Sequence, residues 1–323
     1  MKSILQLAGL CLLSGAATAN AQTLLSIPFD NDDDLQYIVA PVDEVAVEPA
    51  FDNQRCLVVG SDVVTQALKP IAVQALKKYK LTIRAAVDDS DTVETNDRLP
   101  EILAKNGGKS FAACQLTFFD KDGEETSFLL YGRIRMRADP ISIISGQLHE
   151  FVSVFYAPPE AETLQLKLLP RGRKVWIDEI VVERETSEGT ENGNPDFRYG
   201  KFNLSGWDPG SEGRLYVRPD GTTVLKCGTS GGSAFFAVDD QARYSFECKG
   251  AGYSKTAGKV TVSFYGITGK DLGFTHLFWG RDMEEGATKN GIKPPPGAKL
   301  AMLKSSRLIL EQVMVTQDGP ATD

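Results

Sequence analysis

Short runs in which apolar and polar residues alternate recur along this chain, whereas stretches with a helical period are scarce. The runs are bounded by glycine, proline, asparagine or aspartate, and this pattern is typical of an all-β sandwich. The predicted strands of the first half of the chain are 55–59, 79–87, 111–120, 150–156 and 163–169. Those of the second half are 222–227, 242–250, 259–266 and 307–315. One moderately helix-like stretch, 97–109, is predicted to lie on a long loop.

The two series of strands match one another in the same order, which indicates an internal repeat. Four pairs of segments carry the match: YKLTIRA (79–85) with YSFECKG (244–250), QLTFFDKDG (115–123) with TVSFYGITG (261–269), PPEAETLQL (158–166) with PPGAKLAML (295–303), and VWIDEIVVE (175–183) with LILEQVMVT (308–316). The strand at 174–185 looks like a final strand in mid-chain because it ends the first of two copies. The sequence therefore predicts two β-sandwiches in tandem.

Composition along the chain suggests where the two domains begin and end. We expect a first domain at 22–185, a linker at 186–193, a second domain at 194–318 and a short tail at 319–323. The linker region is polar, acidic and contains glycine, as segments that join domains often do. Each domain is long enough to bury a core of its own.

The N-terminal segment has the features of a signal peptide. Lys2 is followed by an apolar run from Ile4 to Leu13, and Ala19-Asn20-Ala21 supplies the small residues of a cleavage site. The apolar run is too short to span a membrane, and no later segment offers about twenty apolar residues in succession. We expect cleavage after Ala21 and a secreted or periplasmic protein.

Charge and cysteine content narrow the possible partners. The formal net charge of −8 argues against binding to nucleic acid, which requires a basic surface. Four cysteines follow the signal peptide, two in each copy, so Cys56–Cys114 and Cys227–Cys248 are the natural disulfide pairs in an oxidising compartment. Other pairings and buried free thiols stay open. Without a CxxC pair, and with two histidines in the chain, a zinc site is not expected.

Motifs for catalysis are missing from the sequence. The segment GTSGGS (228–233) has the G-x-S-x-G spacing around Ser230, but it lacks the strand-to-helix setting of a nucleophile elbow and the lysine of a phosphate-binding loop. His149 and His276 fall in different copies. A carboxylate pair for glycoside hydrolysis stays open, because only the separation of the two groups in space identifies it. The sequence favours a protein that binds rather than catalyses.

The start of the second copy, NPDFRYGKFNLSGW (194–207), resembles the N-x-D-F-E-x-G…W opening of extracellular carbohydrate-binding modules of the CenC type, the family-four/nine jelly rolls. The tyrosine-led strands, the proline-rich turns and the last strands of both copies occupy the places that this family gives them, so the resemblance covers most of 25–318. It implies two tandem jelly-roll β-sandwich domains with a galactose-binding-like fold. It also implies that they bind poly- or oligosaccharide without catalysis.

The same resemblance implies a structural calcium in the first domain. Calcium takes six to eight oxygen ligands, and the family often holds it between an acidic N-terminal segment and the acid of the last strand. The corresponding residues here are Asp30, Asp32, Asp34 and Asp178. In the second copy the resemblance implies that Arg198 replaces the metal by pairing with Glu311. The alternative is a solvated acidic turn beside a strand-edge carboxylate.

Sugar sites combine aromatic faces with a few polar groups. The candidates are Trp279, His276, Arg281, Tyr253 and Trp207 in the second domain and Trp176 in the first. For each aromatic residue the alternative is burial in the core, which is favoured for Trp207.

Strict alternation over 274–279 makes a specific prediction for this set. It places Phe274, His276 and Phe278 on one face of a strand. Trp279 then lies on the opposite face.

Two other functions remain open from the sequence. The sandwiches could serve protein contacts in a structural or surface-assembly protein, with another exported protein as partner. They could also hold a glycoside hydrolase site that no motif reveals.

Overall fold

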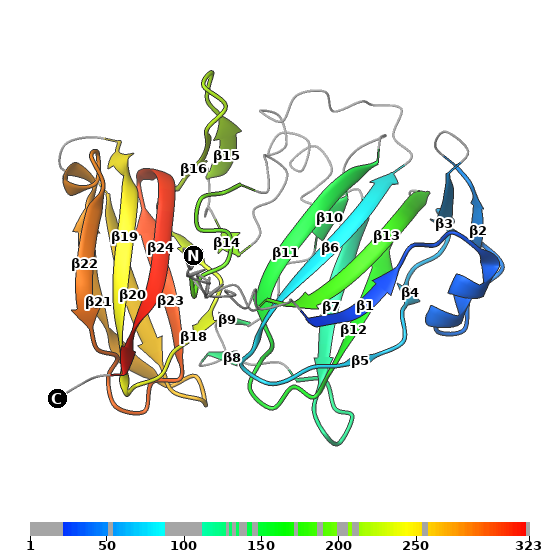
Figure 1. The fold of residues 1–323 in the computed structure, drawn as a ribbon, viewed down its shortest axis with the longest axis horizontal. Coiled ribbons are helices and arrows are strands. Elements are labelled where there is room, and N and C mark those ends of the chain that lie inside the picture. The colour runs from blue at the N-terminus through cyan, green and yellow to red at the C-terminus, as the bar shows by residue number, and fades with distance from the viewer. Residues whose placement is uncertain are drawn as a thin grey trace, which may run out of the picture.

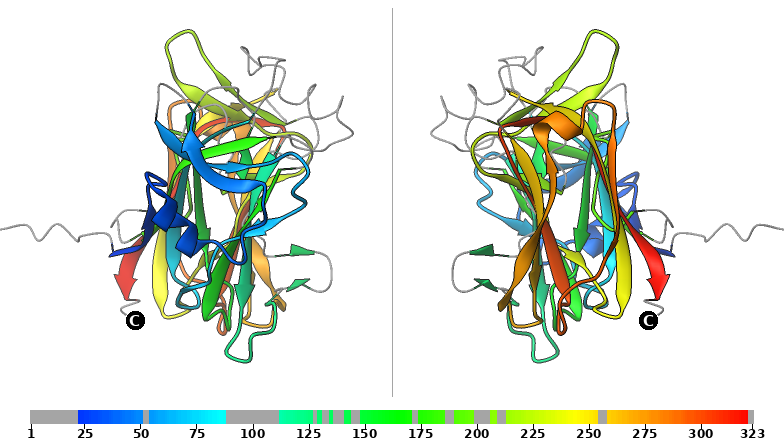
Figure 2. Two further views of the ribbon diagram at one scale, coloured as in Figure 1. Left: turned by 90° about the vertical axis from the view of Figure 1, so that its right-hand side faces the viewer. Right: turned by 90° about the vertical axis from the view of Figure 1, so that its left-hand side faces the viewer.

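The computed structural model describes residues 22–50, 54–87, 112–126, 129–130, 134–135, 141–143, 148–170, 174–185, 190–198, 206–208, 213–253 and 258–320. The predicted signal peptide and the loop at 97–109 lie outside these residues. Two β-sandwiches follow one another along the long axis of the molecule (Figure 1). A quarter turn brings the first sandwich to the front in one view and the second in the other (Figure 2). No helix among the described residues is long and apolar enough to cross a membrane.

The first sandwich is built from two antiparallel sheets. One has the order β11-β6-β13-β3-β2, with β1 on β13, and the other has the order β10-β7-β12-β4, with β5 on β12. Their bounds are β1 Gln22–Ile27, β2 Val45–Pro49, β3 Arg55–Val59, β4 Gln66–Ala67, β5 Ile71–Ala72, β6 Lys78–Val87, β7 Ala112–Phe119, β10 Ile141–Ile143, β11 His149–Tyr156, β12 Thr163–Leu169 and β13 Val175–Arg184. A 3-10 helix, η1 (Asp32–Tyr37), and a short hairpin of β8 (Leu129–Leu130) with β9 (Ile134–Arg135) complete it.

The second sandwich has the same construction. One sheet has the order β15-β16-β24-β19-β22, and the other, which we call the groove sheet, has the order β14-β17-β23-β20-β21 with β18 on β23. The bounds are β14 Trp207–Asp208, β15 Arg214–Val217, β16 Thr223–Lys226, β17 Gly231–Ser233, β18 Phe236–Ala237, β19 Ala242–Gly252, β20 Lys259–Tyr265, β21 Asp271–Trp279, η4 Gly280–Asp282, β22 Ala287–Ile292, β23 Leu300–Ser306 and β24 Leu308–Pro320. The predicted fold class, all-β with two tandem jelly-roll β-sandwich domains, is confirmed. The residue boundaries of the domains stay a prediction.

Local hydrogen bonds repeat between the two copies. The hydroxyl oxygen of Tyr79 accepts from the backbone N–H of Gln74 at 2.7 Å, and that of Tyr244 accepts from Asp239 at 2.8 Å. Each tyrosine opens the long strand that the sequence repeat aligned, and each is fully buried. The aligned tyrosines therefore fix the same turn onto the same strand in both copies.

The last strand of each sandwich carries an acid at a β-bulge. β13 slips against β6 between Ile177 and Glu179, which leaves Asp178 unpaired in the ladder. β24 slips against β19 between Leu310 and Gln312, which leaves Glu311 in the equivalent place. A bulge turns one extra side chain out of the regular alternation, so each acid can reach a cation on the neighbouring strand.

The partners of these two acids differ from the expected ones. Asp178 accepts hydrogen bonds from Gln54 and, at 2.8 Å, from Arg84 of β6. Glu311 pairs with Arg218 and, at 2.8 Å, with Lys249 of β19.

The prediction that Arg198 pairs with Glu311 is therefore wrong. Arg198 instead pairs with Asp196, two residues away, at 2.9 Å. The lysine that aligns with Arg84 in the repeat, Lys249, already lies beside Glu311.

The structure contains four buried free cysteines, so the expected disulfides are absent from it. Cys114 of β7 faces the core of the first sandwich, whereas Cys56 of β3 lies outside that core, on a strand whose Leu57 and Val59 face inward. Burial raises the pKa of Cys56 to about 11 and that of Cys114 to about 12.

In the second sandwich Cys227 accepts a hydrogen bond from Ser305 at 3.2 Å. The sulfur of Cys248 lies 3.1 Å from that of Met283. All four thiols are buried, which agrees with the alternative of buried free thiols.

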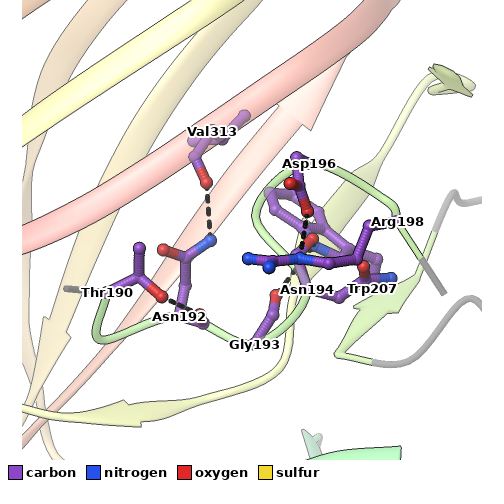
Figure 3. A network of polar contacts seen from close by, with 8 residues as sticks. All are labelled: Thr190, Asn192, Gly193, Asn194, Asp196, Arg198, Trp207 and Val313. Carbon is purple, nitrogen blue, oxygen red and sulfur yellow. Dashed lines mark hydrogen bonds and ion pairs between the residues drawn. The ribbon is translucent and has the colours of Figure 1, made fainter. Parts of the chain in front are cut away.

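The described part of the linker region lies against the second sandwich. The Asn192 side chain donates to the carbonyl of Val313 at 2.7 Å (Figure 3). It also accepts from the N–H of Val315 at 2.9 Å, so it pairs with β24 as a strand would. On the other side, Lys78 donates to Thr190 and Tyr156 donates to the carbonyl of Glu191 at 2.9 Å. The segment is thus fixed between the two sandwiches.

Candidate functional site

A groove of about 750 Å³ lies on the groove sheet of the second sandwich. It is lined by side chains and backbone from β17 with the loop before it, and from β20, β21 and β23. The lining residues are Thr229, Ser230, Gly231, Gly232, Ser233, Lys259, Thr261, Ser263, Phe274, Met302, Lys304, Ser305 and Ser306. Seven of them carry a hydroxyl group, although those of Ser233 and Ser305 bond to Ala234 and Cys227 within the sandwich.

Alternation in β20 explains why polar side chains face the groove. Val260, Val262 and Phe264 point into the core, as period-two alternation requires. Lys259, Thr261 and Ser263 therefore point outward.

The ladder places three cross-strand rows on this face, because residues directly opposite one another share a face of the sheet. The rows run from β21 through β20 to β23: Phe274–Ser263–Met302, His276–Thr261–Lys304 and Trp279–Lys259–Ser306. Successive rows are two residues apart, or about 6.8 Å along the strands.

A β-bulge at Leu277 brings Trp279 onto the same face as His276. The pairing of β20 with β21 slips between Val260 and Thr261, so Leu277 has no partner in the ladder. Leu277 and Phe278 both pack into the core. The prediction that Trp279 lies opposite His276 and that Phe278 lies beside it is therefore wrong, since one extra residue reverses the alternation.

Two aromatic side chains on this face are exposed. Phe274 is 72% exposed and Trp279 is 45% exposed. The Trp279 ring lies 4.3 Å from the His276 ring between centroids, at an angle of 38°. The face therefore combines an apolar platform with hydroxyl groups, as small-molecule sites do.

The surroundings of His276 favour its neutral form. Burial lowers its pKa below the ordinary value of 6.5, and the nearby charges of Lys289 and Lys259 lower it further, although Asp282 opposes them. Its Nε2 atom is buried without a hydrogen-bond partner in the described residues. The backbone carbonyl of His276 accepts from Lys289 at 2.6 Å.

Trp207 is a core residue. It is 1% exposed, and its indole N–H donates to the carbonyls of Gly193 and Asn194 at 3.2 and 3.1 Å (Figure 3). Its ring meets Phe197 edge-on, with centroids 5.5 Å apart. Trp207 therefore anchors the start of the second domain, which agrees with the core burial that the sequence favoured, and it is not placed to contact a sugar.

None of the six predicted sugar-contact residues is among the lining residues of the groove, although His276 and Trp279 lie on the same face of the sheet. Tyr253 is 44% exposed, donates a hydrogen bond to the carbonyl of Cys227 and lies under Lys226, whose Nζ is 5.4 Å from the ring centroid. Arg281 is exposed and lies 3.5 Å from Asp282. Trp176 belongs to the first sandwich, where Lys174 lies 5.6 Å from its ring centroid. The structure does not bring these three together.

The acids implied as calcium ligands have other partners. Asp32 pairs with Arg55, Asp34 accepts from the backbone N–H of Asn31 at 3.2 Å, and Asp178 pairs with Arg84. Burial raises the pKa of Asp178, the charge of Arg84 opposes this, and that of Asp30 adds to it. Among the residues that the structure describes, no group of three or more histidine, cysteine or acidic side chains is placed to hold a metal. As arranged, these residues do not fit a calcium ion, and its presence stays a prediction.

Sequence reasoning missed most of the groove lining. Lys259, Thr261 and Ser263 were part of a predicted strand, and Lys304 and Ser306 follow the next repeated segment. The signal was available in the polar positions of KVTVSFY (259–265), all of which fall on one face beside the neighbouring strand of Phe274. To predict that this face points outward, one also needs the order of the strands in the sheet, which the sequence does not give.

No protein-family model matches the chain, and no curated protein matches it in sequence. Among solved structures it is similar to the CBM22-1–CBM22-2 tandem domain of Paenibacillus barcinonensis Xyn10C, at 11% identity over 93% of this chain and 99% of that chain, with a TM-score of 0.37. The CBM22-1 xylan-binding domain of Xyn10C gives 13% identity over 52% of this chain and 97% of that chain, with a TM-score of 0.35.

The carbohydrate binding module CBM6cm-2 of Cellvibrio mixtus lichenase 5A, in complex with cellotriose, gives 11% identity over 50% of this chain and 98% of that chain, with a TM-score of 0.29. At these scores the likeness assigns neither a family nor a ligand to this chain. The assignment to CenC-type modules therefore stays a prediction.

Proposed function

We propose that this chain is an exported, non-catalytic carbohydrate-binding protein whose second sandwich binds poly- or oligosaccharide in the groove. The observation that carries the proposal is the exposed ring of Phe274 beside the hydroxyl groups of Thr261 and Ser263. An aromatic face can stack on the C–H face of a sugar ring, while nearby polar groups fix its orientation. Export rests on the signal peptide predicted at residues 1–21.

The repeated rows suit an extended ligand. Each row offers a polar side chain of β20 next to a residue of β21, and the rows recur about every 6.8 Å along the strands. A ligand made of repeating units can use the same kind of contact in successive rows. A small ligand would contact only one of these rows.

The groove lining supports binding rather than hydrolysis. Glycoside hydrolysis in most families needs two carboxyl groups flanking the scissile bond. None of the described residues that line the groove is acidic. We therefore assign it no catalytic step.

Affinity electrophoresis through gels that contain soluble neutral and acidic polysaccharides tests the proposal. We expect at least one polysaccharide to retard the protein and Phe274→Ala to weaken that binding about tenfold or more, as loss of a central aromatic contact does. Ile267→Ala is the matched control, because Ile267 is an exposed apolar residue of the same sandwich that does not line the groove.

Migration at the same rate through every gel would overturn the proposal. A stable complex with a co-purified exported protein, lost in Phe274→Ala, would instead support a structural or surface-assembly protein. Turnover of a chromogenic glycoside would establish a hydrolase.

A further inference from the structure

We infer that the groove selects acidic sugar residues and that Lys259 and Lys304 recognise their negative charge. This inference rests on the proposed function and narrows it to a class of ligand. It begins from the charge of the lining, in which these two lysines are the charged side chains among the residues described. The whole chain, by contrast, has a formal net charge of −8. The groove therefore reverses the charge of the molecule locally.

The two lysines are placed to act together. Lys304 lies opposite Thr261 on the neighbouring strand, and Lys259 precedes Thr261 by two residues on the same face. Such diagonal neighbours are about 7–8 Å apart between backbone positions. Two flexible lysine side chains at that separation can both reach one carboxylate or sulfate group lying over Thr261.

Neither lysine has a carboxylate partner among the described residues. Two other lysines of the same sandwich do: Lys249 lies 2.8 Å from Glu311, and Lys299 lies 3.3 Å from Asp240. Lys304 instead lies 5.8 Å from the ring centroid of Tyr265. Charges without an internal counter-ion remain available to an anionic ligand.

Two acids at or just beyond the ends of β21 are engaged with other groups. Asp282 lies 3.5 Å from Arg281, and Asp271 accepts from the backbone N–H of Gly273 at 2.7 Å. His276, which lies on the same face, has a pKa below its ordinary value, so its neutral form predominates at neutral pH. The positive charge of the groove therefore comes from the lysine pair.

The first sandwich provides an internal comparison. Lys167 occupies the position of Lys304 in the repeat and lies 5.9 Å from the ring centroid of Phe119, as Lys304 does from Tyr265. Ala113, which is buried, stands where the second copy has Lys259. The lysine pair is a feature of the second copy alone, so the inference concerns the groove and not the fold.

The ligand chemistry can come from a uronic acid carboxylate or from a sulfate ester. Isothermal titration of the full chain with polygalacturonate, alginate and dextran sulfate separates the two sources. Methyl-esterified polygalacturonate is the neutral counterpart of polygalacturonate, and unmodified dextran is the neutral counterpart of dextran sulfate. We expect binding to an acidic polymer about tenfold or more tighter than to its neutral counterpart, since hydrogen bonds to charged groups are the stronger ones. Binding should weaken as salt is raised.

The double variant Lys259→Gln/Lys304→Gln tests whether these two lysines recognise the negative charge of the ligand. Both lysines are exposed, so their replacement should leave the thermal unfolding temperature unchanged. We expect the double variant to bind acidic and neutral counterparts equally. Lys293→Gln, at an exposed lysine outside the groove, should retain the preference.

The outcomes separate this inference from the proposed function. Equal binding of an acid and its neutral counterpart, or binding of neutral polysaccharides alone, would overturn the inference and leave the proposed function standing. A preference that survives in the double variant would also overturn it. Failure to bind any polysaccharide would overturn the proposed function and the inference together.

Discussion

Two tryptophans of the second sandwich show how position on the sheet determines the role of a side chain. Trp207 lies in β14 within the core, and its indole N–H bonds two backbone carbonyls. Trp279 lies in β21 on the outer face, beside Lys259 of the neighbouring strand. The same residue type therefore stabilises the fold in one place and is available to a ligand in the other.

Trp207→Phe should destabilise the protein. The variant loses volume in the core and leaves the carbonyls of Gly193 and Asn194 without their donor, so we expect the free energy of unfolding to fall by about 2–4 kcal/mol. Urea unfolding followed by circular dichroism measures this change. Trp279→Phe, at a site that is 45% exposed, should change the free energy by less than about 0.5 kcal/mol. Equal losses in the two variants would contradict the assigned roles.

His276 should titrate below its ordinary pKa, and Lys259 should be one cause. Because the folded-state pKa lies below 6.5, the neutral histidine favours the fold at higher pH, and that stability is lost as the pH falls from 6.5 through the folded-state pKa. NMR titration of the two histidines, assigned with His149→Gln, measures this directly. In Lys259→Gln the pKa of His276 should rise toward 6.5. A pKa that does not move would remove Lys259 from the surroundings of the ring.

At the scale of strands, the bulges limit what the sequence could predict. The order of the strands along the chain, and its repetition in two copies, could be predicted from four repeated segments, because alternation and turn residues are local signals. The bulge at Leu277 adds one residue without any change in composition, so a strict period of two placed Trp279 on the wrong face. The bulges at Asp178 and Glu311 give those acids partners that only the register identifies. The free state of Cys56 likewise depends on which face of a sheet meets the core.

The acid at the second bulge should stabilise the fold in a pH-dependent way. Hydrogen bonds from Lys249 and then Arg218 hold the pKa of Glu311 below its ordinary value of 4.5, although burial opposes them. A lowered pKa means that this stability is present above 4.5 and is lost as the pH falls through the folded-state pKa. Glu311→Gln should therefore lower the free energy of unfolding by about 1 kcal/mol at pH 7, an amount discounted because Lys249 is half exposed.

Unfolding in urea at several pH values, with Glu285→Gln as an exposed control, tests this prediction. The difference between wild type and Glu311→Gln should shrink as the pH falls from 4.5 through the folded-state pKa. A difference that persists in acid would show that the side chain acts through packing and not through its charge.

At the scale of the whole molecule, the groove sheet also contacts the first sandwich. Leu76, from the turn before β6, packs against a cluster of Phe235, Tyr265, Leu300 and Met302. Met302 also lines the groove. Met302 therefore belongs both to the lining of the groove and to the contact between the sandwiches.

Leu76 has a backbone conformation that makes this contact testable. Its φ angle of +59° lies in the left-handed region, which asparagine tolerates better than most residues. Leu76→Asn should therefore remove the apolar contact without adding backbone strain. We expect it to lower the coupling between the sandwiches by about 1 kcal/mol, the value of a partly buried leucine side chain, and to separate their unfolding transitions in calorimetry. Val64→Asn, at a valine of the first sandwich that is 85% exposed, should leave the transitions as in wild type. If Leu76→Asn unfolds as wild type does, the two sandwiches are coupled through the segment around Asn192 and not through the groove sheet.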